Sequence, residues 1–187
     1  MKTVPRLALV ACVLLSVALG AHDLTESSAL LTVRDSGIVE LRLTIPYDDV
    51  LRRATMPNQP LPVFLAAFSS AADRAVAAAL TTLHEHVRRE TRVVADGRPV
   101  PLTAWEWPDV GLVRTGFRRA AMMATVGTHE HMERLTVTAR GQLAGGAPIR
   151  QVQIQLPEQL GPALVTVIHP EERWLRGGAL SAPMPIR

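Results

Sequence analysis

Cysteine is nearly missing from this chain, because Cys12 is its one cysteine among 187 residues. Cys12 lies in an N-terminal apolar segment that we predict is removed from the mature protein. The mature protein is therefore expected to have no disulfide bond, no thiolate ligand for a metal and no cysteine nucleophile. Its stability must then come from the packing of a hydrophobic core.

Long apolar runs are missing as well. The run from Leu7 to Leu19 follows Lys2 and Arg6 and ends at Gly20 and Ala21. About 13 apolar residues suit the central region of a secretory signal peptide and are too few to span a bilayer. We predict a signal peptide over residues 1–21, cleaved after Gly20 or Ala21, and a periplasmic or secreted protein. A lipid-modified cysteine within the run is the alternative, but the residues after that cysteine stay apolar, which disfavours it.

Lysine does not occur after Lys2, so arginine supplies all the remaining positive charge. Without the signal peptide, 18 basic residues face 17 acidic ones, which leaves a net charge close to +1. A charge so near zero argues against nucleic acid as a partner. No segment after His169 is apolar enough to span a membrane.

Signatures of common catalytic sites are also missing. Gly145-Gly146 has neither the spacing nor the following lysine of a phosphate-binding loop. Ser27-Ser28 lacks the glycines that flank the nucleophilic serine of a hydrolase elbow. Asp48-Asp49 is predicted to form a turn or a helix cap. We therefore expect a protein that is not an enzyme.

Strand patterns are abundant. Between Val39 and Ile45, apolar residues alternate with polar ones, and the turn residues Asp35-Ser36-Gly37 precede them, which predicts a hairpin over residues 28–46. A second hairpin is predicted around Asp96-Gly97, and the prolines that follow indicate that its second strand is an edge strand or an irregular one. Further strands are predicted at 118–126, 134–139, 151–156 and 164–168, the last of them covered on both faces.

One stretch, residues 61–89, has helical spacing of its apolar residues. Ser69-Ser70 and Asp73 are predicted to divide it into two helices, with Asp73 capping the second. The predicted fold is mainly β: a single antiparallel β-sandwich of immunoglobulin-like size over residues 22–176, with this one helical insertion. Residues 177–187 are predicted to be a mobile C-terminal tail.

Several short motifs are shared with a known family. They cover most of the mature chain and are His22-Asp23-Leu24, Ile45-Pro46-Tyr47, Leu61-Pro62-Val63-Phe64-Leu65, Ala95-Asp96-Gly97, Leu156-Pro157 and His169-Pro170. With these motifs the chain resembles the exported domain that precedes the membrane part of bacterial HupE/UreJ-type proteins. The resemblance implies a periplasmic β-sandwich and a link to nickel or other metal handling. The family's transport activity is not carried over, because the membrane part has no counterpart here.

Histidine supplies the sharpest chemical signal. Two copies of one tripeptide, His84-Glu85-His86 and His129-Glu130-His131, place histidines two residues apart. In a strand both imidazoles of such a pair lie on one face and can bind one ion, whereas in a helix they diverge by about 200°. A site without thiolates suits copper(II), nickel(II) or zinc. His22, if it becomes the first residue, adds an amino-terminal chelator, and solvated surface histidines are the alternative.

Trp105 and Trp107 flank Glu106 and would share one face of a strand. That face is either an exposed partner-binding patch or part of the core. Together the observations predict an exported, non-enzymatic domain that binds a metal ion or a partner, either a membrane transporter or another periplasmic protein. The alternatives are an interaction module without metal, and a copper enzyme or copper chaperone that uses His22.

Overall fold

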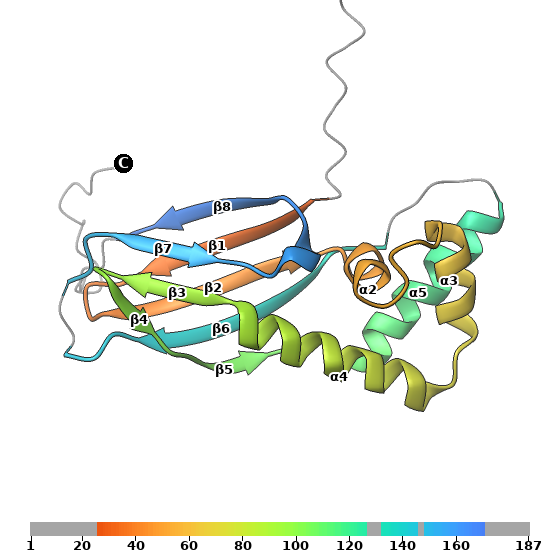
Figure 1. The fold of residues 1–187 in the computed structure, drawn as a ribbon, viewed down its shortest axis with the longest axis horizontal. Helices are drawn as coiled ribbons and strands as arrows, with labels where there is room; N and C mark the ends of the chain where they lie inside the picture. Colours follow the sequence, from red (N-terminus) through yellow and green to blue (C-terminus); the bar gives the residue numbers. More distant parts are fainter. Residues whose placement is uncertain (1–25, 127–131, 146–147, 171–187) are drawn as a thin grey trace, which may run out of the picture.

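The structure, a computed structural model, describes residues 26–126, 132–145 and 148–170. Within these ranges the chain forms eight strands in two sheets and four α-helices, so the fold is mixed α/β (Figure 1). The predicted mainly-β, all-antiparallel sandwich with one helical insertion is therefore wrong. The predicted signal peptide, 1–21, and the predicted tail, 177–187, lie outside the described residues.

The larger sheet has five strands in the order β5-β6-β2-β1-β8. β1 and β2 form the hairpin predicted around Asp35-Ser36-Gly37, with Leu31 opposite Leu41. β6 pairs antiparallel with β2, whereas β8 runs parallel to β1, which makes the sheet mixed. The strands are β1 (Ser27–Val33), β2 (Ile38–Ile45), β5 (Leu102–Glu106), β6 (Leu135–Gln142) and β8 (Ala163–Ile168).

The smaller sheet has the order β4-β3-β7, with β3 (Arg92–Ala95), β4 (Arg98–Val100) and β7 (Val152–Gln155). The hairpin predicted at Asp96-Gly97 is confirmed. Both turn residues have positive φ, 47° and 75°, as a tight two-residue turn requires. β4, which contains Pro99, is an edge strand, one of the two possibilities that the prolines allow, because proline cannot donate to a sheet ladder.

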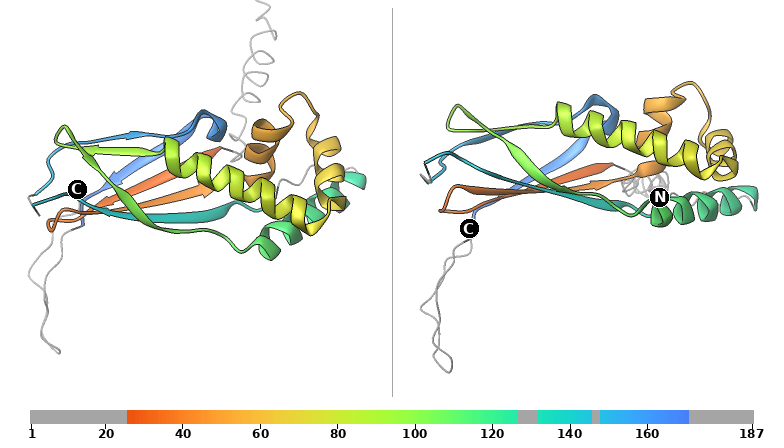
Figure 2. Two further views of the ribbon diagram at one scale, coloured as in Figure 1. Left: turned by 60° about the horizontal axis from the view of Figure 1, so that its bottom comes forward. Right: turned by 90° about the horizontal axis from the view of Figure 1, so that it is seen from below.

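Four α-helices gather at one end of the two sheet layers, as the two views in Figure 2 show. The helical stretch predicted at 61–89 is confirmed, and it is divided at residues 71–72. Asp73 does not act as the cap of the second helix; Ala72 is the N-cap residue, and Asp73 instead pairs with Arg114. The helices are α2 (Tyr47–Thr55), α3 (Leu61–Ser70), α4 (Asp73–Glu90) and α5 (Val110–Thr125), and a short 3-10 helix, η1 (Glu158–Leu160), precedes β8.

α5 replaces the strand predicted at 118–126, so that prediction is wrong. The Asp109 side chain caps the helix by accepting hydrogen bonds from the backbone N–H groups of Gly111 and Leu112, at 2.8 and 3.2 Å. Val113, Phe117 and Ala120 then bury one helical face. Phe117 packs on Phe64 and Phe68 of α3, with ring centroids 5.8 and 4.6 Å away. This packing stabilises the helix. Val113 and Phe117 precede residue 118, so the sequence of 118–126 alone contains only part of the buried helical face.

Candidate functional site

The histidine pair His84 and His86 lies within α4, where residues two apart diverge by about 200°. The two side chains accordingly have different neighbours: His84 contacts Tyr47, and His86 contacts Gln159. They therefore do not face one ion together. The other predicted ligands, His22, His129 and His131, lie outside the described residues. Within the residues that the structure describes, no group of three or more His, Cys, Asp or Glu side chains is arranged to hold a metal ion.

His84 belongs to an aromatic column that crosses from α2 to β5. Its Nε2 lies 3.2 Å from the Tyr47 hydroxyl, and its ring stacks on Trp107 with centroids 4.0 Å apart and planes 12° apart. Trp107 stacks in turn on Trp105, at 5.2 Å and 8°. The column joins four residues from α2, from α4, and from β5 and the segment after it, so it holds the helical end against the larger sheet.

The column keeps both of its polar groups uncharged. Burial lowers the pKa of His84 to about 4, because the imidazolium would lose its hydration. Burial also raises the pKa of the Tyr47 phenol above its usual range, and Tyr47 has no exposed surface. In the tautomer that carries its proton on Nδ1, a neutral His84 accepts the Tyr47 hydroxyl hydrogen at Nε2. The buried phenol is thereby satisfied.

Trp105 and Trp107 are both partly buried and pack against the core. The indole N–H of Trp105 donates to the carbonyl of Leu102 at 3.3 Å. Of the two interpretations offered by the sequence, this arrangement favours a structural role over an exposed patch. A partner-binding role for the two tryptophans stays a prediction.

His86 forms a separate polar chain. Its Nε2 lies 2.7 Å from Oε1 of Gln159 in η1, and Arg89 Nη2 lies 3.0 Å from its Nδ1. Because a guanidinium only donates, Nδ1 accepts and the proton is on Nε2, which donates to Gln159. Both ring nitrogens are thus engaged beside a surface hollow of about 350 Å³ that Glu85 and Arg89 also line.

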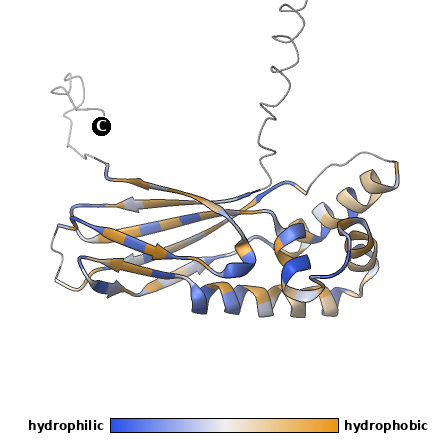
Figure 3. Ribbon diagram, turned by 45° about the horizontal axis from the view of Figure 1, so that its top comes forward, coloured by the Kyte–Doolittle hydropathy of each residue, from blue (hydrophilic) through white to orange (hydrophobic). Residues whose placement is uncertain are grey.

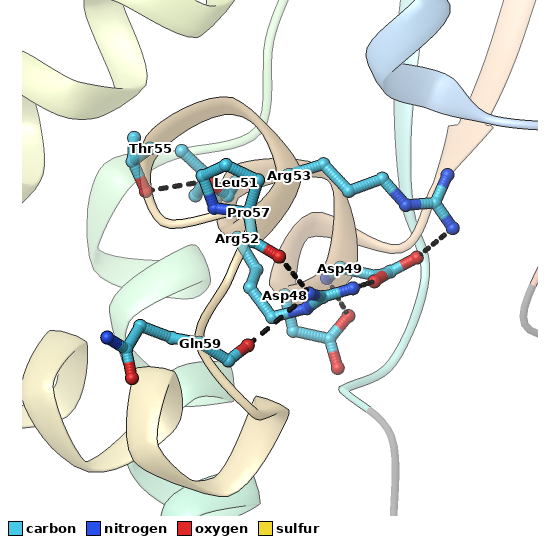
Figure 4. Close-up of polar contacts among 8 residues, drawn as sticks. All are labelled: Asp48, Asp49, Leu51, Arg52, Arg53, Thr55, Pro57 and Gln59. Atoms are coloured by element: carbon cyan, nitrogen blue, oxygen red, sulfur yellow. Dashed lines mark hydrogen bonds and ion pairs between the residues drawn. The ribbon is translucent and has the colours of Figure 1, made fainter.

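α2 contains the acidic pair Asp48-Asp49 in its first turn (Figure 4). Asp48 is fully buried, and its carboxylate accepts the backbone N–H of Asp49 at 2.9 Å and of Met132 at 3.0 Å. Asp49 pairs with Arg52 at 2.7 Å and with Arg53. Arg52 also donates to the carbonyls of Pro57 and Gln59, so these side chains organise the loop between α2 and α3. The roles seen here are structural.

The most exposed apolar strand is β8, at the margin of the larger sheet (Figure 3). Four of its six side chains are large, apolar and at least 40% exposed: Leu164 68%, Val165 40%, Val167 49% and Ile168 41%. The expectation that this strand is covered on both faces is wrong. An uncharged apolar run fits a buried strand and an open edge equally well, so its sequence could not separate the two.

The register between β8 and β1 shows which faces of β8 are uncovered. Val165 and Val167 pair with Ala29 and Leu31 of β1, which are buried in the core. Paired residues on neighbouring strands share a face, so the two valines continue the core face beyond β1 and leave it uncovered. Leu164 and Ile168 extend the opposite face. Both faces of β8 are therefore apolar.

The other sheet edges in the described chain are protected. β5 has a register shift between Thr103 and Glu106, with Ala104 at φ 36°, and such bulges obstruct pairing. β4 is three residues long and contains Pro99, and β7 is four residues long. β8 contains no charge, no proline and no bulge among its six residues.

The chain matches no family model, and it is not significantly similar to any curated protein or solved structure. The resemblance to HupE/UreJ-type proteins therefore stays a prediction. None of the helices in the described ranges combines the length and the apolar character needed to cross a bilayer.

Proposed function

We propose that this chain is an exported, non-enzymatic interaction domain that binds a partner protein by adding one of the partner's strands to β8. The observation that carries the proposal is the six-residue edge with apolar side chains on both faces and no protecting device. Such an edge is a template for strand addition, in which backbone hydrogen bonds supply affinity and alternate side chains supply specificity.

The edge defines the chemistry of the partner strand. Pro162 and Pro170 bracket β8, and proline cannot donate to a ladder, so the docked segment spans about six residues. On the core face it would cover Val165 and Val167, which requires apolar residues at alternate positions. A charged partner strand would bury unpaired charge against these valines and is excluded by its desolvation cost.

Metal binding, the other half of the sequence prediction, rests on residues outside the described ranges. Strand addition needs only residues that are described. A membrane transporter or another periplasmic protein remains the expected source of the strand, and the open edge fits either.

The test uses the mature protein and a short synthetic peptide of alternating valine and threonine. We expect hydrogen exchange at the β8 amides to slow when the peptide is added, with no change in β5. Val165→Lys together with Val167→Lys should abolish the protection, because each lysine places a charge where the peptide must pack. Peptide protection that is absent, or equal in β5 and β8, would contradict the proposal.

A second arm places a photoreactive phenylalanine analogue at Thr166 in producing cells, with Thr103 on the opposite edge as the matched position. We expect one cross-linked protein from Thr166 that the double lysine variant loses. A cross-link only to a second copy of the chain would replace the partner by self-association.

A further inference from the structure

The aromatic column of Tyr47, His84, Trp107 and Trp105 combines two features that packing alone does not require. One end is a phenol hydrogen-bonded to an imidazole, and the other end is a stacked pair of indoles. Among side chains without sulfur, tyrosine and tryptophan give up a single electron most readily. Strand addition at β8 involves none of these residues, so a role of the column in electron transfer is independent of it.

Tyr47 is the buried end of the column. It has no exposed surface, and its hydroxyl lies 3.2 Å from Nε2 of His84. A phenol that has lost an electron is a strong acid, so a buried tyrosine is oxidised only where a neighbouring base takes its proton. A backbone carbonyl is too weak a base for this, whereas a neutral imidazole can accept the proton. Burial lowers the pKa of His84 to about 4, so its lone pair is free at neutral pH.

The two indoles are the outer end of the column. Trp105 and Trp107 are partly exposed, and their rings are nearly parallel, with centroids 5.2 Å apart and planes 8° apart. Trp107 also stacks on His84 at 4.0 Å, and the His84 ring meets the edge of Tyr47 at 6.0 Å. Electron transfer slows steeply as the distance between rings grows, so closely packed successive rings favour it. A continuous series of ring contacts thus joins the surface to Tyr47.

The composition of the chain leaves few competing end points for an oxidation. Tyr47 is its one tyrosine. Cys12, its one cysteine, lies in the segment that we predict is removed. The third tryptophan, Trp174, lies outside the described residues. Any tyrosyl radical formed in this protein is therefore on Tyr47, and its spectrum identifies it.

We propose that the column carries oxidising equivalents from one-electron oxidants at the protein surface to Tyr47. The oxidant takes one electron from Trp105 or Trp107 and leaves an indole radical cation. Tyr47 then returns one electron to the indole, its O–H bond breaks, and the proton forms an N–H bond at Nε2 of His84. The products are the reduced oxidant, a neutral tyrosyl radical and an imidazolium. Because burial disfavours the imidazolium, its proton returns to Tyr47 when a small-molecule reductant supplies an electron to the radical.

The experiment oxidises the mature protein with a photogenerated tris(bipyridyl)ruthenium(III) complex, in a Trp174→Phe background that leaves only the two indoles of the column. Transient absorption and electron paramagnetic resonance distinguish indole radicals from tyrosyl radicals. We expect an indole radical first and the Tyr47 radical as it decays, more slowly in deuterium oxide because a proton moves. His84→Gln should lower the tyrosyl yield about tenfold or more, because glutamine cannot take the proton and a lost proton acceptor typically costs about a hundredfold in rate.

Two further variants separate this path from general effects. His86→Gln removes an imidazole from the same helix but outside the column, and it should leave the tyrosyl yield unchanged. Trp105→Phe together with Trp107→Phe should lower the yield, because the complex does not oxidise phenylalanine and cannot reach the buried Tyr47. Circular dichroism confirms that each variant is folded.

Three results would overturn the proposal. The first is an indole radical in the parent that decays without a tyrosyl radical. The second is an equal tyrosyl yield in the parent and His84→Gln, which would mean that the imidazole is not the proton acceptor. The third is an equal yield in the parent and the double phenylalanine variant, which would mean that the electron does not travel through the indoles.

Discussion

His84 stacks on Trp107 with ring centroids 4.0 Å apart, and the same imidazole reaches the buried hydroxyl of Tyr47. This contact turns a candidate metal ligand into a structural element. A histidine in this position must stay neutral, since its proton would have to enter a partly buried aromatic column. The pH dependence of stability should reveal it.

The first prediction is that the protein loses stability as pH falls from about 6.5 to about 4. The folded pKa of His84 is about 4, below the unfolded value of 6.5. Between these pH values the unfolded chain binds a proton that the folded chain does not bind, which favours unfolding. The stabilisation is therefore complete above pH 6.5 and lost as pH falls. Because His84 is only partly buried, solvent screening reduces the effect to roughly 1–2 kcal/mol.

Urea unfolding at several pH values measures this effect. His84→Gln should have a flatter profile between pH 6.5 and 4 than the parent, and His86→Gln controls for the loss of an imidazole from the same helix. Parallel profiles for the parent and His84→Gln would contradict the assignment.

The second prediction concerns the partner of that stack. Trp107→Ala should cost about 2–4 kcal/mol, because it leaves a cavity beside His84 and Trp105. It should also raise the pKa of His84 from about 4 towards its ordinary value, because water reaches the imidazole. An NMR titration of the His84 ring distinguishes this from a general loss of stability. An unchanged pKa would show that Trp107 does not shield the histidine.

The sequence predicts the elements whose structure depends on neighbouring residues. The hairpins at Asp35-Ser36-Gly37 and Asp96-Gly97 follow from alternation and turn residues, which are features of neighbouring residues. The aromatic column was not predictable in this way: Tyr47 and His84 are 37 residues apart, and only the packing of α2 against α4 brings them together. The spacing of His84 and His86 would suit a shared metal ion only in a strand, and the helix that contains them, which the sequence predicts over 61–89, separates the two imidazoles.

The errors have a common physical cause. The strand predicted at 118–126 is wrong because the helical face of these residues is recognised only together with Val113 and Phe117, upstream in α5. The prediction that β8 is covered on both faces is wrong because an uncharged apolar run does not show whether another layer packs on it. In both cases the deciding interaction is with a distant segment, so the sheet order and the open edge could not be derived from the sequence.

The third prediction compares two leucines in the larger sheet. Leu41 of β2 is 1% exposed and Leu164 of β8 is 68% exposed. Leu41→Asp should cost several kcal/mol, enough to unfold a domain of typical stability, whereas Leu164→Asp should change stability by less than about 1 kcal/mol. Thermal unfolding of the two variants checks this. Similar losses would mean that β8 is covered in the folded protein.

The fourth prediction concerns the turn that leads into β8. Gly161 has φ 67° and ψ −160°, which only glycine adopts readily, and an added Cβ would overlap the guanidinium of Arg53. Gly161→Ala should therefore cost about 1–3 kcal/mol. Gly97→Ala, with φ 75° and no nearby atoms, is the matched control and should cost less. Arg53→Ala in the Gly161→Ala background should recover part of the loss, and no recovery would mean that the cost is backbone strain alone.

The last prediction addresses metal binding, which rests on His22, His129 and His131. If these residues converge on one ion, calorimetric titration should show one copper(II), nickel(II) or zinc ion bound with micromolar or tighter affinity, about 8 kcal/mol. His84→Gln should leave this affinity unchanged, because its Nε2 faces Tyr47 and its ring lies on Trp107. His129→Ala together with His131→Ala should abolish it.

Binding should also weaken below about pH 6.5, since imidazole must be neutral to coordinate. Equal affinities for the parent and the double variant would exclude His129 and His131 as ligands. A parent that binds none of the three metals would contradict metal binding and leave strand addition at β8 as the proposed function.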